Sequence, residues 1–492
     1  MKTSRQPQSV YRNQNVLLRA LFERAGSARK VLCVALDYAK SKHVALCCDG
    51  HGEILKAPFP VENNPQGVDF LCEQVATTAR RRKLGKGSIF FGGEDEASYV
   101  ANFTAALRER GYLVVRVNAF EASEQRENLL ASTDNLDLLG IAKTLISRRA
   151  RLTGHDDPDA AAYRQLRELC RCRRALVRQL TATSNRIHAI SDELLPGYLN
   201  ASKSGITPFA GASLQLMKER FSAPQIARRR PTALANLLRR HHVHHPEESA
   251  AKLLALAGSV LPPAAGRVAP LQRTLAASVD LHECLDGNAA GLRAEAALLL
   301  ARTPYVMLTS IRGIGPVLAA GVAGELGAPA QLPRPDSLCA YAGIVPGTLQ
   351  TGGPDQPAFH GHTRARCNRV LKDWTVQSAQ KIALYGSPEL KERITRWQAN
   401  GQHAVFAAAR RYLRLLHALV KNQVPYLAPA GRARGAARDE IAAACQDSWQ
   451  VLMKKWRPIP GGCQAICAED SPLGIWRRVV MELHNIHLPT RP

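Results

Sequence analysis

Residues 31–61 read VLCVALDYAKSKHVALCCDGHGEILKAPFPV, and this stretch decides the fold of the N-terminal part of the chain. Val31 to Leu36 and His43 to Cys48 are short apolar runs, and Asp49-Gly50-His51-Gly52 separates the second run from a third, Glu53 to Val61. Short apolar runs bounded by Gly and Asp are typical of strands joined by tight turns. We therefore predict an antiparallel meander of three strands.

Downstream of the meander, helices and strands are expected to alternate. Gly67 to Arg82 has helical spacing, Ser88 to Gly92 resembles a short strand, Tyr99 to Arg110 a helix, and Leu113 to Val117 another strand. Three hairpin-linked strands followed by alternating helix and strand is the order of a ribonuclease-H/RuvC-like α/β domain. We place this domain at residues 31–150, after a basic extension over residues 1–30.

The remainder of the chain reads mainly as helix. Arg164 to Leu194 carries apolar residues at helical intervals between many arginines, which predicts a long exposed helix or coiled-coil arm. We assign residues 151–302 to a helical, coiled-coil linker, residues 303–427 to a compact, mainly helical domain, and residues 428–492 to a C-terminal extension.

The charge balance favours a nucleic-acid partner. The chain has 66 Lys and Arg against 41 Asp and Glu, a formal net charge of +25. A GC-rich coding sequence would explain the preference for Arg over Lys, but it would not explain the surplus of bases over acids. Such a surplus attracts polyanions and makes binding to phosphate backbones sensitive to salt.

The cysteine pattern and the hydropathy indicate a compartment. Twelve cysteines are scattered along the chain without a signal peptide ahead of them, so they do not resemble a disulfide framework. No stretch is long and apolar enough to span a bilayer. We expect reduced thiols, no membrane partner and a cytoplasmic location.

Four carboxylates form the candidate catalytic site. Asp37 directly follows the first apolar run, and Glu94 lies just beyond the strand that ends near Gly92. Asp134 and Asp137 are three residues apart, so they share a face if a helix begins there, although Asp134 would alternatively be its N-cap. Clustered carboxylates bind hard cations such as Mg²⁺, and two such ions clamp the oxygens of a phosphodiester. Each acid alone would be an ordinary turn or helix-start residue; their combination in so basic a chain predicts a metal site.

With these acids, the sequence resembles the insertion-sequence-110 family of transposases, the bridge-RNA-guided recombinases of bacterial mobile elements. The resemblance covers roughly residues 30–195 and 303–427. In the first stretch it rests on the opening strand with its acid (Leu36-Asp37-Tyr38-Ala39-Lys40), on Glu94 with Tyr99 downstream, on Thr133-Asp134 and Asp137, and on Arg167 to Tyr198 as the coiled-coil linker. The usual Ala-Thr-Gly after the glutamate is replaced here by Asp95-Glu96-Ala97.

The second stretch carries the more specific motifs. Ile311 to Pro316, followed by Ala319 to Gly327, resembles a helix-hairpin-helix element, in which Gly313 and Gly315 would let the backbone approach a phosphate. The remaining matches are Ala340 to Pro346 before the nucleophile loop, Gln350 to Gly353 in that loop, a basic helix suited to phosphates (Arg364, Arg366, Asn368, Arg369, Lys372), and Trp397 to Gly401 with the helix up to Pro425.

One departure from the family concerns the nucleophile. The family uses a serine in this loop, and the matching residue here is Thr351. Threonine is a competent nucleophile, but its extra methyl group crowds the attack and stiffens the side chain. Three interpretations stay open: Thr351 acts, Thr348 or Thr363 has replaced it, or strand exchange has been lost.

The resemblance implies a complete reaction scheme. A Mg²⁺-dependent site of Asp37, Glu94, Asp134 and Asp137 would activate the hydroxyl, which attacks DNA and leaves a covalent protein–DNA phosphodiester. A 3′-hydroxyl of the partner duplex would reverse the step without ATP. The implied partners are the element ends and target DNA, an element-encoded guide RNA that reads the sequence, and further copies of the chain in a dimer or tetramer at the bacterial nucleoid.

Two rival functions use the same residues differently. A junction nuclease of the RuvC type would need the four acids and water but not Thr351. A repurposed, non-catalytic transposase would bind nucleic acid alone. The run Arg239 to His245 is interpreted as a solvated basic surface and not as a metal tract, and the pairs Cys170/Cys172 and Cys463/Cys467 lack partner pairs at zinc spacing.

Overall fold

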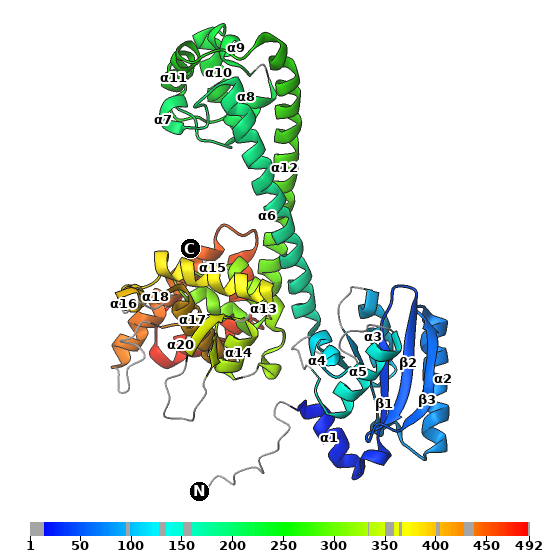
Figure 1. Cartoon of the computed structure of the whole chain (residues 1–492). Coiled ribbons are helices and arrows are strands. Elements are labelled where there is room, and N and C mark those ends of the chain that lie inside the picture. Colours follow the sequence, from blue (N-terminus) through cyan, green and yellow to red (C-terminus); the bar gives the residue numbers. More distant parts are fainter. Residues whose placement is uncertain are drawn as a thin grey trace. The chain divides into compact units, whose positions relative to one another are not determined.

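The computed structural model forms two compact units, residues 1–158 and residues 159–492, each with its own elements (Figure 1). The residues that it describes are 14–94, 99–126, 134–150, 160–219, 221–332, 334–349, 359–363, 367–399, 404–427 and 437–490.

The first unit is built on a five-stranded sheet of order β3-β2-β1-β4-β5. β1, β2 and β3 pair antiparallel, whereas β4 runs parallel to both β1 and β5. This mixed sheet confirms the predicted α/β class, and the three-strand meander is present. The strands are β1 (Leu32–Asp37), β2 (Lys42–Asp49), β3 (Ile54–Glu62), β4 (Ile89–Glu94) and β5 (Leu113–Val117).

Helices cover both faces of the sheet because its central strands are apolar on both sides. In β1, Leu32 and Val34 enter one core cluster, and Cys33 and Ala35 enter the other, as the alternation of a strand requires. The first cluster lies under α2 (Pro65–Arg81) and α3 (Tyr99–Glu109); the second lies under α1 (Val16–Ala25), α4 (Ala119–Glu124) and α5 (Asp134–Ile146). Short 3₁₀ helices occupy Ala28–Lys30 and Lys86–Ser88.

Part of the expected N-terminal extension belongs to this core. Leu18, Leu21 and Phe22 of α1 are buried in the second cluster. Asn15 caps the helix by accepting hydrogen bonds from the amides of residues 17 and 18, and its own Nδ2 donates to the carbonyl of Ala150 at 3.2 Å. The segment is short, and its inward residues are separated by polar ones, so the sequence did not distinguish it from a basic tail.

A pair of long helices, α6 (Ala161–Leu194) and α12 (Ala265–Ala301), forms the arm of the second unit (Figure 1). The start of α6 and the end of α12 share one core cluster, and the end of α6 and the start of α12 share another, so the two helices are antiparallel. The helix expected over Arg164 to Leu194 is therefore present as α6. The cluster at the far end of the arm is surrounded by α7 (Ala201–Ser204), α8 (Gly211–Lys218), α9 (Ala223–Ala227), α10 (Pro231–Arg240) and α11 (Pro246–Ser259).

The near end of the arm joins the body of the second unit, whose described residues are mainly helical apart from one two-stranded hairpin. Its elements are η4 (Pro304–Ser310), α13 (Pro316–Leu326), η5 (Pro329–Gln331), α14 (Pro335–Tyr341), β6 (Pro346–Leu349), β7 (Phe359–Thr363), α15 (Arg369–Tyr385), α16 (Pro388–Ala399), α17 (Ala404–Asn422), α18 (Arg438–Trp456), α19 (Gly462–Cys467) and α20 (Pro472–His484).

The three C-terminal helices share the core of the body. Trp449 and Trp456 of α18 are among the largest fully buried side chains of the chain, and Ile466 and Leu473 belong to the same cluster as α13 and α17. Residues 437–490, which the sequence led us to expect as an extension, thus pack with the motifs of residues 303–427.

The cysteines and the apolar helices bear on the expected compartment of the chain. None of the twelve cysteines, all of which lie in the described residues, forms a disulfide. None of the helices in the described part of the chain combines the length and the apolar character that a membrane crossing requires.

Candidate functional site

Asp37 and Glu94 end two neighbouring parallel strands. β1 and β4 are in register from Leu32 opposite Ile89 to Leu36 opposite Gly93, and each acid is the next residue of its strand. The carboxyl ends of parallel strands meet at one edge of a sheet, so the fold brings these two acids to the same edge. Both side chains are partly exposed there.

Two glycines allow the strand that carries Glu94 to lie between close neighbours. A Cβ on Gly92 would lie 2.4 Å from a methyl group of Leu145 in α5, and a Cβ on Gly93 would lie 2.3 Å from the carbonyl oxygen of Leu36 and 2.4 Å from the ring of Tyr38. Side chains at these positions would push α5 and Tyr38 away from the end of β4. We did not predict a role for this glycine pair, although it directly precedes Glu94 in the sequence.

The turn after Asp37 is held by a buried histidine. His43 is fully buried, its ring packs edge-on against Phe103 with centroids 4.4 Å apart, and its Nδ1 accepts a hydrogen bond from the amide of Ala39 at 3.1 Å. Burial lowers the pKa of His43, although hydrogen bonds at Asn63 and Ala39 oppose the shift. The neutral imidazole thus fixes the backbone that follows Asp37.

Asp137 lies in the first turns of α5, which packs along β1. At the other end of the helix, Leu145 lies against Gly92 of β4 and Ile146 lies beside Gly52 in the turn between β2 and β3. Asp137 forms an ion pair with Arg126 at 2.6 Å, and both side chains are about four-fifths buried, so a cationic group already lies against this carboxylate.

The four predicted acids do not form a complete metal site among the described residues. Within those ranges, no three His, Cys, Asp or Glu side chains are grouped as metal ligands. Asp134 is the first residue of α5, but its side chain lies outside what the structure describes. The oxygen-only donor set fits a hard cation such as Mg²⁺ in chemistry, and the four-acid site stays a prediction.

The predicted nucleophile loop connects β6 and β7. Thr351 and the loop residues 350–358 lie outside the described residues, as do Arg364 and Arg366, and nothing is described of the side chains of Thr348 and Thr363. The two strands pair antiparallel, with Pro346 opposite Thr363 and Leu349 opposite Phe359. The hairpin that would carry the nucleophile is therefore present, and the choice among the three threonines stays open.

Of the predicted basic helix, two cations are described in α15. Arg369 is its first residue and is exposed, while the ammonium of Lys372 lies 5.5 Å from the ring centroid of Phe406. Asn368 caps this helix by accepting a hydrogen bond from the amide of Leu371. Arg369 is thus available to a phosphate, whereas Lys372 also contacts the aromatic ring.

Gly313 of the predicted phosphate-binding turn is required by packing within the protein. Its φ is +92°, and a Cβ there would lie 2.5 Å from the carbonyl oxygen of Lys381 in α15. Gly315 is the N-cap of α13, and the element before the turn is the seven-residue 3₁₀ helix η4 instead of an α-helix. The structure explains the first glycine without a ligand, and phosphate binding by this turn stays a prediction.

The C-terminal helix α18 supports the same turn, which the sequence did not suggest. The ammonium of Lys455 donates hydrogen bonds to the carbonyls of Thr309 at 2.6 Å and Ile311 at 2.5 Å. Arg312 pairs with Asp447 at 2.8 Å. Burial, and then the nearby charge of Arg312, lower the pKa of Lys455 to about 7.

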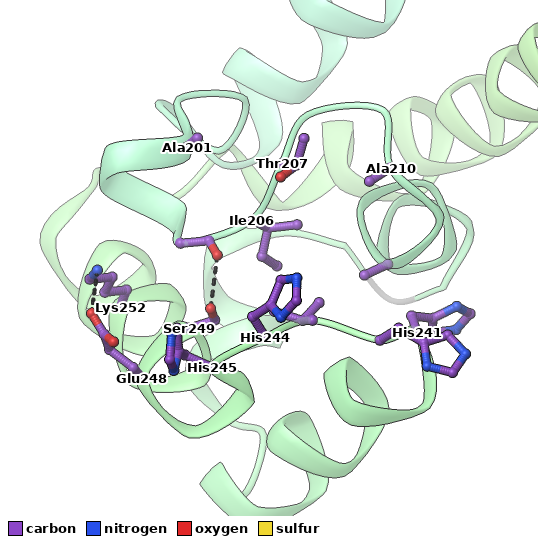
Figure 2. Close-up of a pocket in the computed structure, with 14 residues that line it drawn as sticks. Ala201, Ile206, Thr207, Ala210, His241, His244, His245, Glu248, Ser249 and Lys252 are labelled. Atoms are coloured by element: carbon purple, nitrogen blue, oxygen red, sulfur yellow. Dashed lines mark hydrogen bonds and ion pairs between the residues drawn. The ribbon is translucent and has the colours of Figure 1, made fainter. Parts of the chain in front are cut away.

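The histidine run of residues 241–245 lines a cavity at the far end of the arm (Figure 2). The cavity has a volume of about 360 Å³, and its wall contains all four histidines of the run. Ser249 donates a hydrogen bond to the carbonyl of Gly205, and Lys252 pairs with Glu248. The four histidines are exposed, and within the described residues none belongs to a group of side chains that could hold a metal ion.

The first unit ends two neighbouring parallel strands in acids at one edge of a mixed sheet, and the second unit of the same chain is mainly helical. The comparisons with family models give the class of protein that carries these features. Residues 34–196 match the family model of the DEDD transposases of the IS110 type, described as "Transposase", and residues 305–395 match the model described as "Transposase IS116/IS110/IS902 family". The chain belongs to the IS110 family of transposases and is a DNA transposase acting in transposition and recombination. A comparison with curated proteins finds no match.

The matched regions leave three parts of the chain outside, the first of which is residues 1–33. Residues 197–304 contain the helices at the far end of the arm and α12, and residues 396–492 contain α17 to α20. The second match ends before Trp397 to Gly401, which we had included in the resemblance. These outside parts nevertheless supply residues that contact the matched motifs, as Lys455 does.

Proposed function

We propose that this transposase cuts and rejoins DNA through a covalent intermediate formed by Thr351. The threonine oxygen attacks the scissile phosphorus, the bond to the 3′-oxygen breaks, and the 3′-hydroxyl leaves with a proton. The strand that begins with the 5′-phosphate at the cut then stays joined to the threonine oxygen as a phosphodiester. A 3′-hydroxyl from the partner duplex restores the DNA backbone by the reverse attack, so no external energy source is needed.

We further propose that Asp37, Glu94, Asp134 and Asp137 form the acidic part of the active site. Divalent magnesium bound there would supply charge neutralisation at the scissile phosphate. The observation that carries this proposal is the register of β1 and β4, which ends both strands in an acid at the same edge. The position of α5 along β1 supports Asp137 as a further member.

The remaining partners follow from the family and from charge. The net charge of +25 supports simultaneous binding of DNA and RNA, in which the protein contacts the backbone and an element-encoded guide RNA selects the sequence. The working form is a homo-oligomer, a dimer or tetramer. Gly313, Gly315, Arg364, Arg366, Arg369 and Lys372 are the proposed phosphate contacts.

Covalent capture tests the proposal. The full chain is expressed together with its flanking non-coding DNA, and protein–DNA adducts are isolated under denaturing conditions. We expect adducts with the wild type and with Thr351→Ser, and none with Thr351→Ala. Asp37→Asn and Glu94→Gln should abolish adducts while DNA binding is retained.

Matched variants identify the competing outcomes. Thr348→Ala and Thr363→Ala should leave the adduct intact; loss of the adduct in either one, with Thr351→Ala active, would transfer the role of nucleophile. DNA cleavage without adducts that survives Thr351→Ala would support a hydrolytic nuclease instead. Absence of both cleavage and adducts, with DNA still bound, would support a non-catalytic derivative.

A further inference from the structure

Glu325, near the end of α13, is a buried carboxylate that joins three helices. Its side chain is only 2% exposed. Arg171 of α6 donates to both carboxylate oxygens, at 2.8 Å from Nε and 3.0 Å from Nη2, and Arg167 of the same helix lies 3.8 Å away. Asn368 donates from Nδ2 at 2.9 Å. A buried charge is tolerated only when it is paired and hydrogen-bonded, and Glu325 satisfies both conditions.

The electrostatic balance at Glu325 favours the charged form. Burial raises the pKa of this carboxyl, but the hydrogen bonds from Arg171 and Asn368 and the positive charge of the two arginines outweigh burial, so the net shift is downward. The carboxylate therefore stays ionised and keeps the arginines of α6 bound to α13.

Asn368 connects this carboxylate to the hairpin that carries Thr351. Its backbone N–H donates to the carbonyl of Tyr341 at 3.0 Å, and its side-chain Nδ2 donates to the Tyr341 hydroxyl at 3.1 Å. Tyr341 is the last residue of α14, before β6, and Asn368 directly precedes α15, after β7. The two ends of residues 342–367 are thus held together by one pair of residues, and that pair is bonded to Glu325.

The arm helix is in close contact with α13 at this position. A Cβ on Gly324 would lie 2.7 Å from the backbone nitrogen of Arg167, so only glycine permits this approach of the two helices. A second ion pair, between Arg174 of α6 and Asp373 of α15, joins the arm directly to the helix that follows the hairpin. These cations of the arm are bound within the protein.

We propose that Glu325 is a positioning residue: it couples the arm helix α6 to the base of the β6–β7 hairpin, so that the arm sets the position of the loop with Thr351. The inference rests on the proposed function only for the role of that loop. Neither family match assigns a role to Glu325, Arg171 or Asn368.

Three variants weaken, in graded steps, the contacts that join Arg171, Glu325, Asn368 and Tyr341; we call this group the joint. Glu325→Gln removes the charge but retains the size and one acceptor oxygen. Asn368→Ser keeps an efficient N-cap on α15 but removes the two hydrogen bonds that Nδ2 donates to Glu325 and to the Tyr341 hydroxyl. Tyr341→Phe removes a single hydroxyl. The matched control is Asp336→Asn, which breaks an exposed ion pair between α14 and Arg414 that has no connection to α6.

The experiment measures three quantities on the full chain: DNA affinity, the rate constant for adduct formation on bound DNA, and amide hydrogen exchange. We expect Glu325→Gln and Asn368→Ser to lower the rate constant by about ten- to a hundredfold, the size of effect caused by a small misplacement of a reacting group. DNA affinity should be unchanged in Glu325→Gln, because this side chain is buried. Exchange should accelerate in residues 342–349 and 359–368 and stay unchanged at the far end of α6, and Asp336→Asn should alter none of the three.

The outcomes separate this inference from the proposed function. Wild-type rate and exchange in Glu325→Gln would overturn the inference and leave the function standing. A chain that forms no adducts, even as Thr351→Ser, would overturn the function, and the exchange data would still decide the coupling. If Glu325→Gln lost DNA binding and exchanged faster throughout the second unit, Glu325 would be a general stabilising residue and the inference would be wrong; Tyr341→Phe, the mildest change, checks that result.

Discussion

At the scale of single residues, the candidate site depends as much on small neighbours as on the acids. Gly92 and Gly93 leave no room for a Cβ between Leu145 on one side and Leu36 with Tyr38 on the other. A carbonyl oxygen of a paired strand cannot move aside as a flexible side chain can. The position of Glu94 is therefore set by the strand pairing that the glycines permit.

A methyl group at residue 93 tests this dependence. We expect Gly93→Ala to lower the free energy of unfolding by about 1–3 kcal/mol, as overpacking in a core does, and to reduce adduct formation by displacing Glu94. Denaturant unfolding followed by covalent capture measures both effects. The control is Gly85→Ala, which has open space around its Cβ and should change stability by less than about 0.5 kcal/mol. Equal stabilities of the two variants would contradict the argument.

Lys455 predicts a pH dependence of stability with a definite sign. Its pKa falls from 10.5 to about 7 on folding, chiefly through burial. Between these values the unfolded chain binds a proton that the folded chain lacks, so stability rises as the pH rises from 7 toward 10.5. We expect the thermal unfolding midpoint of the wild type to increase between pH 7 and 9 relative to that of Lys455→Met.

A neighbouring lysine provides the comparison for this prediction. Lys454 lies next to Lys455 on α18 but is exposed. Lys454→Met should therefore keep the pH slope of the wild type, because it leaves the buried ammonium in place. A wild-type slope in Lys455→Met would show that this group does not titrate as proposed.

At the scale of elements, short segments outside the motifs complete the cores. α1 contributes three buried side chains to the first unit, and its cap residue Asn15 also bonds to the segment after α5 through Ala150. In the second unit, α18 supplies the ammonium that satisfies two carbonyls at the turn before α13. Both segments are distant in sequence from what they support.

The cap of α1 offers a test at this scale. Asn15→Ala removes an N-cap and a hydrogen bond to Ala150, and we expect it to lower the free energy of unfolding by about 1–2 kcal/mol. Ser27→Ala is the control, because Ser27 makes one exposed hydrogen bond in the three-residue 3₁₀ helix that follows. Chemical denaturation compares them, and an Asn15→Ala variant no less stable than Ser27→Ala would refute the assignment of α1 to the core.

At the scale of the whole molecule, the net charge of +25 does not measure the number of cations that face nucleic acid. Arg171 is bound to buried Glu325, and Arg174 to Asp373. Arg369, by contrast, is exposed at the start of α15. The effective charge toward DNA is therefore smaller than the composition suggests.

The salt dependence of DNA binding distinguishes these two kinds of arginine. Each phosphate contact contributes about 0.9 to the slope of log affinity against log salt concentration. We expect Arg369→Gln to reduce the magnitude of that slope by about the contribution of one phosphate contact. Arg171→Gln should leave the slope unchanged, because the guanidinium of Arg171 is already paired with Glu325. Titrations at several salt concentrations measure the slope. A reduced slope in Arg171→Gln would place that side chain on nucleic acid and contradict the internal joint.

The sequence alone determined what local pattern and charge can determine. The apolar runs and turns of residues 31–61 predicted the meander, and the acids Asp37 and Glu94 were placed at strand ends. The motifs around residues 311–316 and 340–353 led to the family to which the chain belongs. These properties are readable because strand periodicity, turn residues and motif spacing are short-range.

Only the tertiary structure decided which distant residues meet. It placed α1 and α18 in the cores, enclosed Gly313 against Lys381, and joined Glu325 to both Arg171 and Asn368 across sequence separations that no periodicity encodes. A buried ion pair forms because two helices pack with their charged groups facing each other, and that packing depends on the whole core. An arginine that remains free for nucleic acid and one that is bound inside the protein therefore look alike in the sequence.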